Sequence, residues 1–287
     1  MNDFLMYLTN GVVIGIIYAL SALGVSLIVG IMNVVNFAHG ELYILAGYFS
    51  ALFASALGLG PIPAMVAAVA AIFVLGLLME WTLIRPTYGD DMYSLIITFI
   101  LSIILQNAYL FIFGPYPQKP PNWVGGASNL FGLFFYGNQR LACLGVAVGV
   151  IAGFFLLLHK TWFGRVVRAV SMDREVASML GVNPVKVNLL AFGLGCALAG
   201  AAGVILTPIF PVTPTVGVGV SLTAFVVVVL GGMGSFGGCV VGGLILGLVE
   251  NLGAAYLDSG YKHMFGFVIL ILVLFFRPAG LFGQKQL

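Results

Sequence analysis

Long apolar runs recur along almost the whole of this 287-residue chain, and they constrain its fold more than any other feature. Only 7% of the residues are charged, whereas 61% are hydrophobic. A helix needs about 20 mostly apolar residues to cross the hydrocarbon core of a bilayer, because its backbone groups must bond within the segment itself. No long stretch alternates with the period of two that a membrane barrel requires. The sequence therefore predicts an all-α protein that crosses the membrane several times.

Glycine, proline and charged residues divide the chain into nine candidate spans, and the seventh and eighth are separated only by "LGGMGSFGG". We expect residues 1–287 to form a single transmembrane domain of eight or nine helices. The expected spans are 11–32, 41–58, 62–84, 94–113, 140–158, 187–207, 220–235, 238–257 and 264–276. G-x-x-x-G spacings at 145, 149 and 153, and at 243 and 247, predict close contacts between helices.

Basic residues predict the orientation, because cytoplasmic loops carry an excess of lysine and arginine. The connection 160–186 holds five of the eleven basic residues and is therefore expected in the cytoplasm. Counting spans from this loop places the C-terminus inside and the N-terminus outside. Three basic residues fall on the outer side against this bias: Lys119, Arg140 and Lys262.

Several classes of function are excluded or disfavoured by composition. The formal net charge of +2 is too small to indicate a nucleic-acid partner, so membrane lipid is the expected surroundings. Cys143, Cys196 and Cys239 lie in apolar runs without metal-site spacing, which predicts buried thiols. The three histidines show no metal-ligand spacing either, and no nucleophile lies at a readable spacing from a base. We therefore predict no catalytic residue, no metal and no enzyme activity.

The stretch "RAVSMDREVASMLGVNP", residues 168–184, gathers charge in an otherwise apolar chain. Ser171 is a candidate N-cap, Asp173 and Glu175 suit a first helical turn, and Gly181 is a candidate C-cap. These signals predict a short helix over about 172–180, too short and too polar to cross a membrane. Its apolar side chains are expected to dock on a partner or on the chain's own spans: Ala177, Met179 and Leu180. The alternative is a solvated surface loop.

"EVASMLGVNP" resembles the E-x-A-x-x-x-G pattern in the cytoplasmic loop of bacterial ABC-importer permeases. Together with "GIMNVVNFAHGELYILAG", it makes the chain similar to the high-affinity branched-chain amino acid permease family from about Gly11 to Gly283. The resemblance assigns the ATPase-coupling motif to Asp173, Glu175, Ala177, Gly181 and Asn183, with Arg174 at a variable place.

That resemblance also implies partners and a location. The family works as two similar or identical permease chains on two cytoplasmic ATPase subunits, fed by a periplasmic binding protein. It implies a multi-pass protein of the bacterial inner membrane, with the N-terminus in the periplasm. No lysine is preceded by glycine, so the chain lacks a G-x-x-x-x-G-K-[ST] phosphate loop. ATP-Mg is thus expected on the partner subunits, with no cofactor on this chain.

Polar residues inside apolar runs are the candidate pathway or gate. Asn33, Asn36, His39 and Glu41 stand between two apolar segments, where Gly40 and the asparagines favour a helix break near 30–43. A second break is expected near 229–238, where Gly231, Gly232 and Gly234 would face the first break; tight helix packing is the alternative. Each break precedes two apolar runs and a proline, which suggests an internal duplication. Glu250 is the remaining pathway candidate.

Two alternatives to these assignments stay open. The 33–41 segment could be an ordinary cytoplasmic turn whose polar residues cap helix ends. The whole chain could also be a secondary transporter or channel, for a small polar solute such as urea or an amide, in which Glu41, His39 and Glu250 carry protons or ions. A purely structural membrane scaffold is a third reading, and it predicts no effect from replacing Asn36 or His39.

Overall fold

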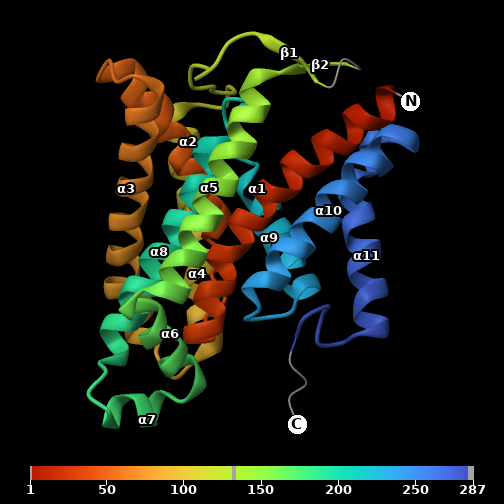
Figure 1. The fold of residues 1–287 in the computed structure, drawn as a ribbon. Helices are drawn as coiled ribbons and strands as arrows, with labels where there is room; N and C mark the ends of the chain where they lie inside the picture. The colour runs from red at the N-terminus through yellow and green to blue at the C-terminus, as the bar shows by residue number, and fades with distance from the viewer. Residues whose placement is uncertain (1, 131–133, 284–287) are drawn as a thin grey trace.

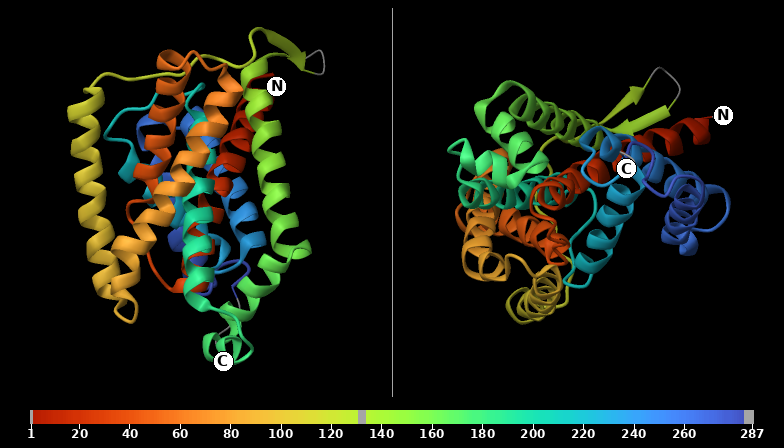
Figure 2. Two further views of the ribbon diagram at one scale, coloured as in Figure 1. Left: turned by 90° about the vertical axis from the view of Figure 1, so that its left-hand side faces the viewer. Right: turned by 90° about the horizontal axis from the view of Figure 1, so that it is seen from below.

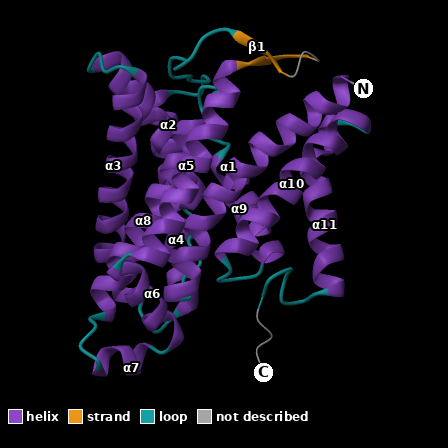
Figure 3. Ribbon diagram, in the orientation of Figure 1, coloured by secondary structure: helices purple, strands orange, loops and turns teal. Residues whose placement is uncertain are grey.

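The computed structural model describes residues 2–130 and 134–283, and these form a bundle of helices with one short hairpin of strands (Figures 1 and 3). The α-helices are α1 (Asn2–Met32), α2 (His39–Ala56), α3 (Pro61–Met79), α4 (Asp91–Phe113), α5 (Asn138–Lys160), α6 (Trp162–Met172), α7 (Arg174–Met179), α8 (Pro184–Leu206), α9 (Gly217–Gly231), α10 (Phe236–Tyr256) and α11 (Lys262–Phe276). A π-helical turn (Glu80–Ile84) and a 3-10 turn (Arg85–Thr87) continue α3, and a 3-10 turn (Ser259–Tyr261) precedes α11. Strands β1 (Ala127–Leu130) and β2 (Phe134–Gly137) pair antiparallel.

Each of the nine predicted spans coincides with a helix to within a few residues, which confirms the all-α membrane fold. Six described helices are long and apolar enough to cross a bilayer: α1, α3 with its continuation, α4, α5, α8 and α10. Helices α9 and α11 are apolar but shorter. The number of crossings, eight or nine, stays a prediction. The hairpin β1–β2 was not expected from the sequence.

Helix α1 forms the centre of the bundle and packs against α10, α8, α9 and α5. Its contact with α10 is very close, since a Cβ added at Gly247 would lie 2.3 Å from the Cα of Gly15. The predicted contact face at Gly243 and Gly247 is therefore confirmed. The face predicted at 145, 149 and 153 is wrong within the described chain, because added Cβ atoms there meet nothing within 4 Å.

The molecule has two distinct ends, here named as they stand in Figure 1. The upper end carries the N-terminus, the hairpin and the connection from α10 to α11. The lower end carries α6, α7, the connection from α9 to α10, and the C-terminus (Figures 1 and 2). Helix α4 stands at the outside of the bundle (Figure 2), with large apolar side chains exposed along it, as a lipid-facing helix requires.

Candidate functional site

The chain leaves the helical path between α1 and α2. Helix α1 ends at Met32, and Asn33 takes a φ of 54°, a left-handed conformation that asparagine tolerates better than most residues. The side-chain oxygen of Asn36 accepts a hydrogen bond from the N–H of Ala38 at 3.0 Å. The predicted break is thus confirmed, and both asparagines take part in it. Gly40 lies beyond the break, in the first turn of α2.

Two helix N-termini, those of α2 and α9, meet inside the bundle. The N–H of Gly40 donates to Ser221 Oγ at 2.8 Å, and that hydroxyl donates to the carbonyl of Phe37 at 3.0 Å. A Cβ added at Gly40 would lie only 2.0 Å from the carbonyl oxygen of Gly217. Gly40 is therefore required for close approach rather than for a turn, which corrects the sequence-based expectation.

This junction lies at mid-depth in the bundle. Ser102 Oγ donates to Glu41 Oε1 at 3.3 Å, and Thr98 Oγ1 donates to the carbonyl of Val35 at 3.2 Å. Ser102 is eleven residues beyond Asp91, about 16 Å along the 23-residue helix α4 at 1.5 Å per residue. Helices α2 and α9 therefore both begin beside the middle of α4, as interrupted helices of transporters do.

The polar residues of the break are buried: Asn36 is 2% exposed, and His39 and Glu41 are 0% exposed. His39 Nε2 lies 3.0 Å from the carbonyl oxygen of Ser21 in α1. An ordinary solvent-exposed turn does not fit this burial, whereas the role of these residues in a pathway stays a prediction. Within the described ranges, no three metal-binding side chains gather into a group that could hold a metal ion.

The carboxylate of Glu41 faces the N-terminus of α9. A Cβ added at Gly217 would lie 2.4 Å from Glu41 Oε1, so the carboxylate occupies the space of a missing side chain. A helix N-terminus carries partial positive charge, which stabilises an acidic group there. Glu41 Oε2 has no hydrogen-bond partner among the described residues. The acid therefore holds α2 and α9 together and leaves one oxygen for another donor.

A cavity of ≈ 300 Å³ opens among α1, α2, α9 and the segment before α9. Its walls are mainly apolar, and its polar lining residues are Tyr18, Ser21, Tyr43, Thr223 and Lys262. Ser21 also binds His39 through its carbonyl group, so only one residue separates the cavity from the buried break. None of Asn33, Asn36, His39 and Glu41 lines the cavity itself.

The second break is also present, over residues 232–235, but its glycines serve packing. Gly232 and Gly234 have φ values of +103° and +79°. A Cβ added at Gly231 would lie 2.4 Å from the backbone of Gly238, and one at Gly232 would lie 2.5 Å from the backbone of Gly283. The tight-packing alternative thus describes these glycines. Their expected position facing residues 33–41 is not what these contacts show, and a gating role stays a prediction.

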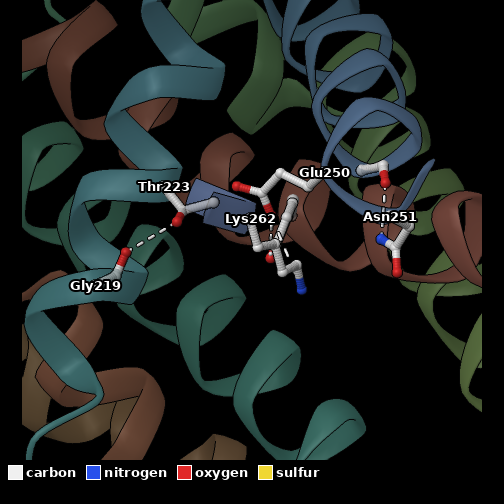
Figure 4. Close-up of polar contacts among 7 residues, drawn as sticks. Gly219, Thr223, Glu250, Asn251 and Lys262 are labelled. Atoms are coloured by element: carbon white, nitrogen blue, oxygen red, sulfur yellow. Dashed lines mark hydrogen bonds and ion pairs between the residues drawn. The ribbon is translucent and has the colours of Figure 1, made fainter. Parts of the chain in front are cut away.

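Glu250 lies apart from both breaks, in the upper half of α10. It is 2% exposed and accepts a hydrogen bond from Tyr18 Oη at 2.9 Å. Its Oε2 atom also lies 4.0 Å from Lys262 Nζ (Figure 4). The structure therefore places Glu250 beside the cavity rather than with His39 and Glu41.

The charged stretch does form a short helix, α7, but with a different start. Asp173 Oδ1 accepts from the N–H groups of Glu175 and Val176, both at 2.9 Å, so Asp173 is the N-cap. The expected cap, Ser171, lies inside α6 and donates to the carbonyl of Arg168. That expectation was wrong because the chain is already helical before residue 172. Gly181, with φ +85°, ends the helix as predicted.

Helix α7 projects from the lower end of the molecule (Figure 1). Ala177 turns inward and is 2% exposed, whereas Met179 and Leu180 are 82% and 79% exposed. Val176 completes this outward apolar face at the i, i+3 and i+4 spacing. Asn183, placed by resemblance in the coupling motif, caps α8 by accepting from the N–H groups of Val185 and Lys186.

Arg174 ties α7 to the rest of the bundle, a role that the sequence did not indicate. Its guanidinium lies 5.4 Å from the centre of the Tyr88 ring, and Tyr88 donates its hydroxyl to buried Glu80. With its amide turned to satisfy its neighbours, Asn188 of α8 accepts from Arg174 at 3.2 Å and from Tyr88 at 3.3 Å. Burial and the adjacent Glu80 raise the pKa of Tyr88, so its hydroxyl stays a donor at neutral pH. This network, hereafter the Arg174 network, joins α7, α8 and the turn after α3.

Comparison with protein families gives one match that spans most of the chain. A model described as the branched-chain amino acid transport system permease component matches residues 7–274. The chain is 34% identical to the high-affinity branched-chain amino acid transport system permease protein LivH of Salmonella typhimurium, over 99% of this chain and 96% of that protein. It is likewise 34% identical to the corresponding permease protein BraD of Pseudomonas aeruginosa, over 99% and 97% of the two chains. Similarity to the Escherichia coli permease protein LivM is lower, at 26% identity over 94% and 68% of the two chains.

Among solved structures, PsaBC from Streptococcus pneumoniae in complex with Fab has a similar fold, with a TM-score of 0.54. The match covers 96% of this chain and 94% of that one at 12% sequence identity. This likeness concerns the arrangement of helices alone.

Proposed function

Because the chain belongs to the family of branched-chain amino acid transport system permease components, we propose that it is the permease subunit of an ATP-driven importer for branched-chain or other hydrophobic amino acids. The chain is a multi-pass protein of the bacterial inner membrane and a transport component. The observation that carries the proposal is α7, a short capped helix with an outward apolar face at one end of an apolar bundle. Such a helix fits a cleft in a partner subunit.

The proposed assembly has four further chains. A second permease chain completes the membrane part; LivH and LivM, both similar to this chain, are named as permease proteins of such transport systems. Two ATPase subunits bind α7 at the lower end and hydrolyse ATP-Mg there, since this chain has no phosphate loop. A binding protein delivers the substrate at the upper end. The lower end, with the C-terminus, is then cytoplasmic, and the N-terminus is periplasmic.

Movement of α7 has a physical route to the interior in this structure. The Arg174 network joins α7 to α8 and to the turn after α3. Helix α8 in turn packs against α1, α2 and α3. Closure of the ATPase subunits would thus shift α8, and with it the junction of α2 and α9 beside the cavity. We propose that this shift alternates access to the cavity.

Replacing Met179 by Asp tests the proposal, because it places a charge in the face that should enter the ATPase cleft. The whole importer is reconstituted in liposomes with internal ATP, and uptake of labelled L-leucine and hydrolysis of ATP are measured. We expect Met179→Asp to lower uptake at least about tenfold, whereas Met179→Leu, which keeps an apolar side chain, stays near the wild-type rate. Equal uptake by both variants, or wild-type uptake that needs a proton gradient and no ATP, would contradict the proposal.

A further inference from the structure

Glu250 and Lys262 form a buried, loosely joined ion pair at the upper half of the bundle (Figure 4). Glu250 Oε2 lies 2.9 Å from Tyr18 Oη and 4.0 Å from Lys262 Nζ. A charge-assisted N–H···O bond normally measures about 2.7–2.9 Å, so the lysine is near the carboxylate without being locked to it. The lysine side chain is 31% exposed, against 2% for the glutamate. Lys262 therefore has both room and water access to move.

This pair lies where two cavities meet on α9. Lys262 and Tyr18 line the cavity of ≈ 300 Å³, and Glu250 lines a smaller cavity of ≈ 170 Å³. Both cavities share Gly219 and Thr223, one turn apart on α9 and joined by the hydrogen bond from Thr223 Oγ1 to the Gly219 carbonyl (Figure 4). Lys262 is the one charged side chain among the described lining residues of the larger cavity.

A structural role alone is a weak explanation for the pair. Two opposite charges taken out of water generally contribute no net stability compared with apolar residues of the same size. Lys262 also lies at the upper end, where the distribution of basic residues disfavours a cation. In membrane proteins, ionisable residues that face a cavity inside the bundle usually belong to a substrate or ion path.

We propose that Lys262 and Glu250 bind the two charges of a free amino acid, as a deepening of the proposed function on which this inference rests. The α-carboxylate binds Lys262, the α-ammonium binds Glu250, and Tyr18 orients the glutamate through its hydroxyl. The apolar side chain of the substrate then occupies the wall formed by Ile14, Ile17, Ile44 and Val220.

Charge balance makes this pair selective for zwitterions. A zwitterion brings one charge of each sign, so it replaces one ion pair by two and leaves no buried charge unpaired. A carboxylic acid without an amino group, or an amine without a carboxylate, would leave Glu250 or Lys262 without its partner. A site with such groups discriminates strongly, because an unpaired buried polar group is costly.

The double variant Glu250→Gln, Lys262→Met tests the proposal, since it removes both charges together and leaves neither unpaired. The complete importer is reconstituted in liposomes with internal ATP and supplied with labelled L-leucine. We expect uptake to fall at least about tenfold, the lower bound for removing a hydrogen bond to a charged group. Hydrolysis of ATP stimulated by the binding protein should stay within about twofold of wild type, because α7 is distant from the pair.

Matched controls are available at the same end of the molecule. Lys119 and Asp258 are an exposed cation and an exposed acid there, so Lys119→Met and Asp258→Asn should keep wild-type uptake. Uptake by the double variant within twofold of wild type would overturn the inference, as would loss of the folded complex on size-exclusion chromatography, which would assign the pair a structural role. Absence of ATP-driven uptake by the wild-type importer would instead count against the proposed function.

Discussion

Replacing Gly40 by Ala should disrupt the junction of α2 and α9, because no space exists there for one methyl group. The added Cβ would lie 2.0 Å from the carbonyl oxygen of Gly217 and 2.7 Å from the backbone nitrogen of Ser221. Ordinary van der Waals contact is about 3.5 Å, so the two helix ends must separate by roughly 1.5 Å. That shift lengthens the Gly40 N–H···Ser221 Oγ bond from 2.8 Å to beyond the limit of a hydrogen bond.

The energetic cost follows from these two effects. Overpacking a well-packed site costs about 1–3 kcal/mol, and each buried hydrogen bond left unmade adds about 1–3 kcal/mol. The sum, roughly 3–6 kcal/mol, exceeds the gain of about 1 kcal/mol that alanine brings to a helix. We therefore expect an apparent melting temperature lower by on the order of 10 °C and L-leucine uptake reduced in proportion to the remaining folded protein.

The assay compares Gly40→Ala with Gly145→Ala in α5, where an added Cβ meets nothing within 4 Å. Thermal unfolding of each purified variant in detergent is followed by tryptophan fluorescence, and uptake is measured in liposomes. Gly145→Ala should unfold within about 2 °C of wild type, because it only improves helix propensity. The same melting temperature and uptake for both variants would refute the claim that Gly40 permits the close approach.

Two further substitutions test the elements around α7. Asp173→Ala removes the acceptor of two N–H groups and should weaken the helix by about 1 kcal/mol, which lowers the ratio of uptake to ATP hydrolysis several-fold; Asp173→Asn, which keeps a capping oxygen, should not. Tyr88→Phe removes the hydroxyl donated to buried Glu80 and should cost about 1–3 kcal/mol, seen as a lower melting temperature. The exposed Tyr93, replaced by Phe, is the control, and an equal melting temperature for both tyrosine variants would contradict the importance of the Glu80 contact.

Short-range signals predicted much of this protein correctly. Apolar runs located nine helices, because the need to pair backbone groups in lipid acts within each segment. Gly181 was recognised as a helix end, and Asn33 and Asn36 as a helix break, because turn and cap preferences depend on a few adjacent residues. Ser171 was misassigned as a cap for the complementary reason: whether a segment is already helical depends on what precedes it.

Contacts between distant segments could not be predicted in this way. Gly40 was taken for a helix breaker, whereas its partner Ser221 is 181 residues away and only packing brings the two together. Ala177 was expected to be available for docking, but the turn of α7 against the bundle buries it and exposes Val176 instead. Arg174, which the coupling pattern marks as variable, acquired its contacts only when the turn after α3 met α7 and α8.

The amino-acid sequence by itself determined that this chain spans a membrane, where its helices lie, and that a short polar helix interrupts them. Tertiary structure alone decided that α2 and α9 begin together at mid-depth and that Tyr18 reaches Glu250 across 232 residues of chain. The physical reason is range. Hydrophobicity and capping act over one segment, whereas a cavity and the charges beside it exist only where several helices have packed together.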